Sequence, residues 1–166
     1  AVVCSAMNRR EFALLACGSA TAYAQTSRAA SPISSSLPLP PQMHSASFDE
    51  SRVFTRIGFG SCYVPQFEES EVWRAILAAS PQAFLLLGDN VYQTEENGRA
   101  ELLELRQAYT ALAADVPFSD VRAAMPVLAT WDDHDYGMND AGADFPARLE
   151  SEALFKHVWA IGPNDP

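Results

Sequence analysis

The sequence predicts an α/β fold built on a parallel sheet, in the order β-α-β-α-β-α. Three observations predict it: short apolar runs rich in β-branched and aromatic residues, helical periodicity between these runs, and polar residues where each run stops. Strands that alternate with helices in this way form layered domains with a parallel sheet. Of the 166 residues 48% are hydrophobic and 19% are charged, which is typical of a globular protein.

The first expected strand covers 53–59 and stops at a Gly-Ser-Cys segment that ends with Cys62. An amphipathic helix is expected next, over 69–79, because its apolar residues recur at helical spacing and Pro81 follows its end. We place four of its side chains on the inward face: Val72, Trp73, Ile76 and Leu77.

The second expected strand, 83–87, is apolar on both faces, as a central parallel strand must be. It ends in the polar segment Gly88-Asp89-Asn90. A helix over 100–114 is expected to follow. It turns four side chains toward the core: Leu102, Leu105, Tyr109 and Leu112. Ser119 is then expected to cap a short helix through Ala124.

The third expected strand, 127–130, opens after Pro126 and ends in the segment Trp-Asp-Asp-His-Asp-Tyr-Gly at 131–137. A last helix is expected over 147–160, before Gly162. Its expected inward side chains are Leu149, Ala153, Phe155 and Trp159.

Residues 1–24 are typical of an export signal that starts at Met7. The pair Arg9-Arg10 precedes a short apolar stretch, which closes in a small-x-small tripeptide at 22–24. This pattern resembles a twin-arginine signal, so we expect the twin-arginine machinery to deliver the protein to the periplasm or outside the cell. A buried N-terminal helix is the alternative. The Pro- and Ser-rich stretch 25–52 is interpreted as a linker, with folded structure beginning near Arg52.

Charge and the length of the apolar runs argue against two classes of partner. The chain has 11 Lys and Arg against 21 Asp and Glu, a net charge of −10. Such a balance argues against nucleic-acid binding, which needs clustered cations. No apolar run reaches the roughly 18 residues of a membrane span. Five Asp and no Lys or Arg fall within 132–144, so part of the acidity is a candidate cation site.

The polar segments all follow expected strands, and parallel strands bring their carboxyl ends to one edge of the sheet. Six candidate functional residues should therefore converge: Cys62, Asp89, Asp132, Asp133, His134 and Asp135. Crowded carboxylates repel one another, and cations relieve that repulsion. Carboxylates suit calcium, whereas thiolate and imidazole favour transition metals. Two metals that share a carboxylate could activate a water and bind a phosphoryl oxygen.

Each candidate also has a structural interpretation. Asp89 could cap a turn, and Cys62 could be a small buried hydrophobe. Asp132 and Asp133 could belong to a solvated loop, and His134 could be structural. A glycosidase-type carboxylate pair is conceivable, but it would leave Cys62 without a role.

Four motifs carry a resemblance to a known family. They are Phe-Gly-Ser-Cys at 59–62, Leu-Gly-Asp-Asn-Val-Tyr at 87–92, Ala-Thr-Trp-Asp-Asp-His-Asp-Tyr-Gly at 129–137 and Asn-Asp-Ala-Gly at 139–142. In order and spacing they resemble alkaline phosphatase D (PhoD-like) metallophosphatases over 53–166. The resemblance implies a layered sandwich of two mixed sheets flanked by helices. We interpret 53–166 as the N-terminal half of that domain, incomplete for catalysis by itself.

The resemblance also implies roles for the motif residues. Asp89 takes the place of the carboxylate that bridges two metals, and Asp133 takes a metal-ligand position. Cys62 becomes an iron ligand, Asp132 supports a cation, and His134 contacts the phosphoryl group. Asn90 and Asn139 stand in the same motifs and are expected to support the ligands or the substrate. The family's iron site can also include a Tyr near the Cys, a place that Tyr63 could fill.

The expected function is hydrolysis of phosphate monoesters or diesters by a metal-activated hydroxide. The implied metals are iron and calcium, with other divalent metals also possible. The alternative is an exported calcium-binding module without catalysis, or an inactive fragment.

Overall fold

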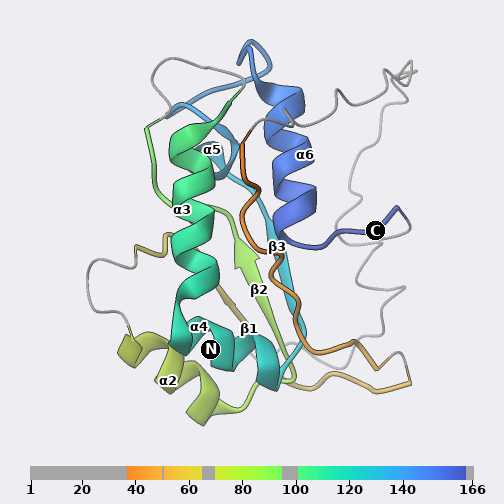
Figure 1. Ribbon diagram of the computed structural model, residues 1–166. Coiled ribbons are helices and arrows are strands. Elements are labelled where there is room, and N and C mark those ends of the chain that lie inside the picture. Colours follow the sequence, from red (N-terminus) through yellow and green to blue (C-terminus); the bar gives the residue numbers. More distant parts are fainter. Residues whose placement is uncertain (1–36, 50, 65–69, 95–100, 164–166) are drawn as a thin grey trace.

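The computed structural model describes residues 37–49, 51–64, 70–94 and 101–163. The predicted signal and the first part of the linker lie outside these ranges, as do the expected starts of the helices at 69 and 100. The described elements are, in chain order, β1 (Ile57–Gly60), α2 (Ser70–Ala79), β2 (Ala83–Leu87), α3 (Leu103–Ala114), α4 (Val116–Ala124), β3 (Val127–Thr130), α5 (Asp133–Tyr136) and α6 (Arg148–Val158). The predicted alternation of strands and helices is confirmed (Figure 1).

The three strands form one parallel sheet in the order β1-β2-β3. Phe59 lies opposite Leu85, and Leu85 lies opposite Leu128, so the strands are in register across the sheet. Each connection between neighbouring strands contains at least one helix, as parallel pairing requires. The carboxyl ends of all three strands therefore lie at one edge, next to α5 (Figure 1).

Strand β1 is shorter than the predicted strand at 53–59. The sheet partner of Ile57 is Ala83, the first residue of β2. Before this point the backbone N–H groups of Thr55 and Arg56 bond to a side chain instead of to a neighbouring strand. The acceptor is Oε1 of Gln82, at 2.6 Å from Thr55 and 3.0 Å from Arg56. The β-branched run is present in the sequence, but the neighbouring strand begins too late to pair with all of it.

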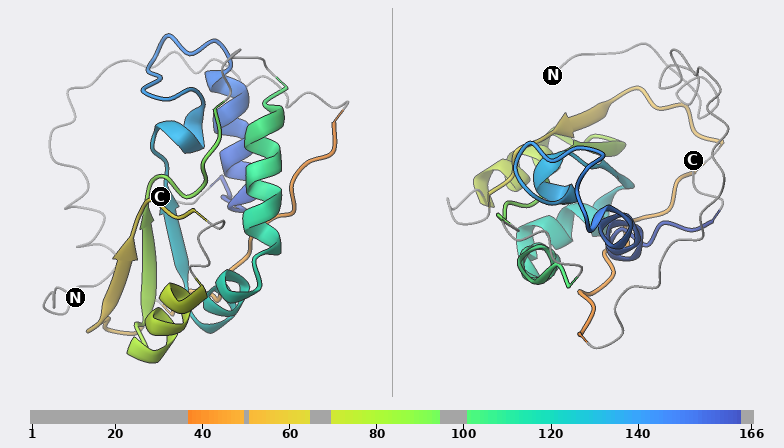
Figure 2. Two further views of the ribbon diagram at one scale, coloured as in Figure 1. Left: turned by 90° about the vertical axis from the view of Figure 1, so that its left-hand side faces the viewer. Right: turned by 90° about the horizontal axis from the view of Figure 1, so that it is seen from above.

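The helices α3, α4 and α6 lie on one side of the sheet (Figure 2). Phe84 and Leu86 of β2 point to this side and are buried in the core. Strand residues alternate between faces, and on the other face Phe59 and Leu87 are 53% and 47% exposed. The sheet is thus packed on one face and open to solvent at these two side chains on the other.

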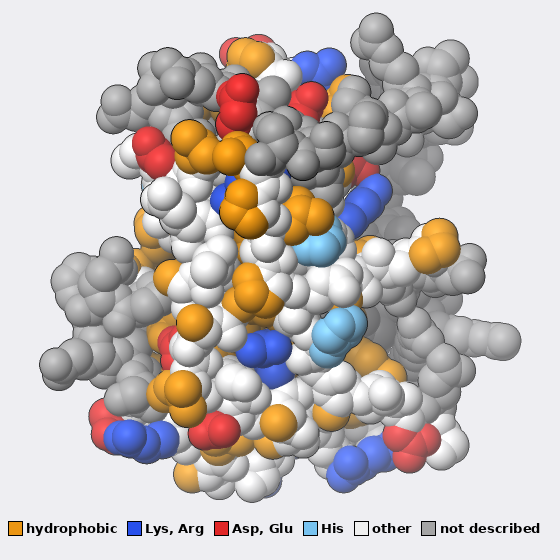
Figure 3. Space-filling model, viewed as in Figure 1, with side chains coloured by type: hydrophobic (Ala, Val, Ile, Leu, Met, Phe, Trp, Pro, Cys, Tyr) orange, Lys and Arg blue, Asp and Glu red, His pale blue; other side chains and the backbone are white. Residues whose placement is uncertain are grey.

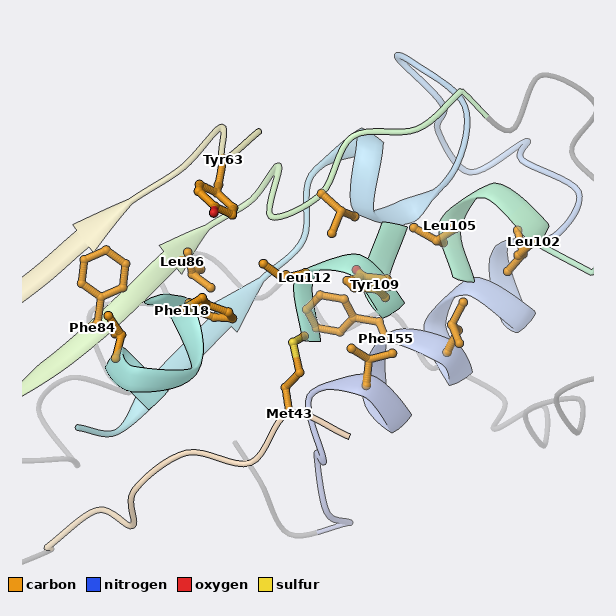
Figure 4. Close-up of a cluster of buried hydrophobic side chains, with 14 of the residues drawn as sticks. Met43, Tyr63, Phe84, Leu86, Leu102, Leu105, Tyr109, Leu112, Phe118 and Phe155 are labelled. Carbon is orange, nitrogen blue, oxygen red and sulfur yellow. The ribbon is translucent and has the colours of Figure 1, made fainter. Parts of the chain in front are cut away.

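Helix α3 packs as predicted. Leu102, Leu105, Tyr109 and Leu112 are all at most 1% exposed (Figure 4). On α2 the inward position of Trp73 is confirmed, since its ring contacts Tyr63, Phe84 and Phe118. The inward position of Val72 is wrong. One residue along a helix is a rotation of about 100°, and Val72 is exposed.

Helix α6 buries a different stripe from the one predicted. Its buried residues are Ser151, Leu154, Phe155 and Val158. Of the expected inward set Phe155 is buried, and Trp159 is partly exposed but packs against the core, with its ring on Phe118. Leu149 and Ala153 are partly exposed and lie outside the core cluster. Ser151 explains the error, because a polar residue on the inward face hides the apolar period. Its hydroxyl donates a hydrogen bond to the carbonyl oxygen of Tyr136.

The predicted cap of the short helix is also wrong. Helix α4 begins at Val116, and its N-cap is Asp115 rather than Ser119. The Asp115 carboxylate accepts a hydrogen bond from the backbone N–H of Phe118 at 3.4 Å. Pro117 in the first turn is the sequence signal for this earlier start.

The described part of the linker packs against the domain. Met43 is 2% exposed, and its backbone N–H donates to the carbonyl oxygen of Val158 at 2.7 Å (Figure 4). Further on, the N–H of Ala46 donates to the carbonyl oxygen of Arg122 at 2.8 Å. Packed structure therefore starts before the expected position near Arg52. This packing depends on backbone hydrogen bonds and on the single apolar side chain of Met43. Neither produces a periodic pattern in the sequence, so the packing could not be predicted.

The described surface is mixed in character. On the face in Figure 3 the Lys and Arg side chains are scattered, and hydrophobic side chains lie between them. None of the helices in the described ranges is both long and apolar enough to cross a bilayer.

Candidate metal centre

The turns after β1 and β2 are joined by backbone hydrogen bonds. The N–H of Cys62 donates to the carbonyl oxygen of Gly88 at 3.4 Å, and the N–H of Tyr63 donates to that of Asp89 at 3.0 Å. Both Cys62 and Asp89 have left-handed backbones, with φ of 60° and 50°. Such conformations are uncommon for residues with a Cβ and cluster at functional sites.

Gly88 lets the end of β3 approach the end of β2. Its φ is +101°, a conformation that L side chains rarely adopt. A Cβ at this position would lie 2.6 Å from the Cβ of Asp132 and 3.0 Å from its backbone nitrogen. The glycine therefore allows Asp132 to lie directly beside the segment that carries Asp89.

Three carboxylates converge as a result. One oxygen from each of Asp89, Asp132 and Asp133 lies within 4.8 Å of the other two. Asp89 follows β2 and the other two follow β3, so the predicted convergence of these strand ends is seen in the geometry. Among the described residues no Lys or Arg forms an ion pair with any of the three.

The two oxygens of Asp89 have different environments. Oδ2 accepts a hydrogen bond from the Tyr92 hydroxyl at 2.8 Å, and the Cys62 thiol lies 3.7 Å from the same oxygen. Oδ1 is buried and has no hydrogen-bond partner among the residues that the structure describes. A buried anionic oxygen without a donor is costly. It therefore fits a site where a cation would sit.

Asp133 is held by backbone donors. Its carboxylate accepts from the N–H of His134 at 2.9 Å and from the N–H of Asp140 at 2.6 Å. The bond from Asp140 is the main reason why the pKa of Asp133 lies below its ordinary value, and the nearby His134 lowers it further. Asp133 is therefore ionised at neutral pH, as a cation ligand must be.

Cys62 is an exposed free thiol beside Asp89. It lies outside the group formed by the three carboxylates. His134 also lies outside that group. Its Nδ1 donates to the carbonyl oxygen of Gln93 at 3.0 Å, and its ring packs against Tyr92 with 4.6 Å between ring centroids. A proton on Nδ1 leaves Nε2 as the atom available for chemistry.

The two asparagines lie in different environments. The Asn90 side chain is buried, and its Nδ2 donates to the carbonyl oxygen of Thr130 at 2.8 Å, which ties the β2 turn to β3. The Asn139 side chain is exposed and donates to the Asp140 carboxylate at 2.6 Å. Contacts of either residue with substrate stay a prediction.

Comparison with solved structures identifies the fold. A structure of PhoD matches this chain with a TM-score of 0.51 and 18% sequence identity, over 74% of this chain and 26% of that one. The fold is PhoD-like. The predicted resemblance is thus confirmed at the level of the fold, and the chain spans about a quarter of PhoD. No protein-family model and no curated protein matches the sequence.

Tyr92 is a residue of this PhoD-like fold whose contact with the acidic group the motif spacing did not predict. It stands three residues after Asp89 and donates a hydrogen bond to it. Burial raises the pKa of Tyr92, and its hydrogen bonds to Cys62 and Asp89 raise it further, so the phenol is a neutral donor. The motif at 87–92 contains this tyrosine, but spacing alone does not reveal a hydrogen bond across a left-handed turn.

Asp135 was a candidate for the converging group, and it is placed differently. Its side chain is fully buried, and burial raises its pKa to about 6 even though several donors surround it. The spacing Asp132-x-x-Asp135 forms a capping box at the start of α5. This spacing is present in the sequence and predicts the short helix α5, which the expected elements do not include.

The Tyr63 side chain is buried in the core. Its hydroxyl donates to Asp115, and its ring packs on Trp73 with 4.8 Å between centroids. In this PhoD-like fold Tyr63 therefore fixes the turn after β1 to the start of α4. Its hydroxyl is hydrogen-bonded to the Asp115 carboxylate.

Proposed function

We propose that the protein carrying this chain hydrolyses phosphate esters, mono- or diesters, at a metal centre that includes Asp89, Asp132 and Asp133. The observation that carries the proposal is the buried oxygen Asp89 Oδ1, which lies beside two further carboxylates and has no hydrogen-bond partner within the described ranges. The PhoD-like fold and the metallophosphatase motifs support it. Because the chain spans only 26% of PhoD, we propose the activity for the natural protein that contains this chain.

The donor set suits iron together with calcium. The thiolate of Cys62 is a soft ligand and favours a transition metal, whereas the carboxylates of Asp132 and Asp133 favour calcium. Asp89 has one oxygen near Cys62 and belongs to the carboxylate group, so it is the residue that could bridge the two cations. Bound cations would lower the pKa of a water and neutralise charge on phosphoryl oxygens.

His134 is proposed as the group that acts on the substrate. Its Nδ1 donates to Gln93, so a second proton on Nε2 makes the ring an imidazolium. Nε2–H can then donate to a phosphoryl oxygen or protonate the leaving alkoxide. The ring of Tyr92 and the carbonyl of Gln93 hold the imidazole in place for this role.

Hydrolysis of an aryl phosphate monoester and diester tests the proposal, with iron and calcium supplied and then removed by a chelator. Asp89→Asn should abolish turnover. Asp120→Asn removes the same charge from an exposed position on α4 and should leave turnover unchanged. Activity that survives both chelation and Asp89→Asn would contradict the proposal. Calcium binding without turnover of either ester would support the non-catalytic calcium-binding module instead.

We also propose that the twin-arginine machinery exports the folded protein to the periplasm or outside the cell, on the basis of Arg9 and Arg10. Replacing both residues by lysine keeps the charge and removes the arginine pair. The variant should stay in the cytoplasm of the native host. Unchanged export would contradict this route.

A further inference from the structure

Asp135 lies between the two turns that carry the acidic group. It is 0% exposed. Its carboxylate accepts hydrogen bonds from the backbone N–H of Asn90, at 3.1 Å to each oxygen, and from that of Asp132 at 3.2 Å. The hydroxyl of Tyr109 also donates to it at 3.2 Å. One side chain thus joins the turn after β2, the turn after β3 and helix α3.

The donors are placed next to the candidate ligands. Asn90 directly follows Asp89, and Asp132 is itself a member of the acidic group. A shift of the Asp135 carboxylate would therefore move the backbone of both strand-end turns. Tyr109 is fully buried in the core (Figure 4), so it fixes Asp135 to the helical layer.

A role in the capping box alone would need only the bond from Asp132. The bonds from Asn90 and Tyr109 cross to other parts of the fold, at 45 and 26 residues along the chain. A carboxylate can accept at both oxygens, whereas an amide of the same shape accepts at one. The arrangement requires a carboxylate at this position.

We propose that Asp135 is a positioning residue: it sets the separation between Asp89 and the pair Asp132–Asp133, and through that separation the affinity of the site for a cation. The effect on affinity rests on the metal centre of the proposed function. The effect on the turns does not, since the hydrogen bonds are formed by the chain alone.

Calcium titration by calorimetry on the full chain tests the effect on affinity. Asp135→Asn should weaken calcium binding by about tenfold or more, the range seen when residues that orient ligands are replaced. Tyr109→Phe keeps the ring and should weaken binding less. Ser151→Ala is the matched control, because Ser151 is also buried and its hydroxyl bonds to Tyr136 instead of to the β2 turn. It should leave the affinity unchanged.

Amide hydrogen exchange without added metal tests the effect on the turns. The amides of Asn90 and Asp132 should be protected in the wild type and should lose protection together in Asp135→Asn and, less strongly, in Tyr109→Phe. The amide of Phe84, bonded to Pro126 at 2.9 Å, should stay protected.

The outcomes separate the two proposals. A wild type that binds no calcium contradicts the metal centre, and the exchange of Asn90 and Asp132 then decides the positioning role alone. Unchanged protection of both amides overturns that role, as does calcium affinity in Asp135→Asn equal to the wild type. If Asp135→Asn fails to fold, the same two readouts in Tyr109→Phe decide, and no change in either would overturn the proposal.

Discussion

The Tyr92 hydroxyl donates a hydrogen bond to Asp89 Oδ2 at 2.8 Å, while Oδ1 of the same carboxylate is buried and has no partner in the part of the chain that the structure describes. The two oxygens thus differ in their hydrogen-bond donors. Oδ2 accepts from the Tyr92 hydroxyl, whereas none of the described residues donates to Oδ1. This difference within one side chain is the structural reason for placing a cation at the acidic group.

Replacing Tyr92 by phenylalanine removes the donor and keeps the ring that packs on His134. Without added metal, the free energy of unfolding should fall by about 1 kcal/mol, the usual net value of one hydrogen bond. Urea denaturation measures it. Tyr136→Phe is the control, because that hydroxyl makes an exposed bond of 3.3 Å to Gly142 and its loss should cost less. Equal losses in the two variants would contradict the account of Asp89.

The order of elements could be predicted from the sequence because strands and helices have different apolar periods. Strand 83–87 is apolar on both faces, and its predicted bounds agree with β2. The convergence of Asp89 with Asp132 and Asp133 follows from the same argument, since parallel strands end at one edge of a sheet. Both predictions depend only on the apolar pattern within single segments and on the parallel order of the strands.

Other features depend on contacts between distant segments, and the sequence pattern does not contain them. The bond from Tyr92 reaches back to Asp89, whose backbone is left-handed. The burial of Asp135 requires Asn90 and Tyr109 to surround it. The cap at Asp115 is different, because an Asp shortly before Pro117 is a helix-start signal within the sequence itself.

Gly88→Ala should be strongly destabilising. The new Cβ would meet Asp132 at 2.6 Å in a backbone with φ of +101°, so we expect a loss of more than about 2 kcal/mol in the free energy of unfolding. At Gly142 the nearest atom to an added Cβ lies 3.5 Å away, and the φ there is not left-handed. Gly142→Ala should be nearly neutral in the same denaturation experiment. A tolerated Gly88→Ala would show that the two turns do not approach as closely as described.

Asp115→Ala tests the corrected helix start. It removes the cap of Phe118 N–H and the acceptor for the Tyr63 hydroxyl. Loss of the cap alone costs about 0.5–2 kcal/mol. Ser119→Ala, at an exposed position inside α4, should change thermal stability little. If Ser119→Ala were the more damaging of the two substitutions, the helix would begin where the sequence pattern first suggested.

Calcium-dependent thermal stability tests the metal centre most directly. A cation that binds only the folded chain raises its stability by about 2.7 kcal/mol when the free cation is about one hundred times its dissociation constant. Calcium should therefore raise the Tm of the wild type and of Asp120→Asn, a chelator should reverse the rise, and Asp89→Asn should show no rise. A wild-type Tm that does not respond to calcium, or an equal rise in Asp89→Asn, would contradict the assignment of Asp89, Asp132 and Asp133 as a cation site.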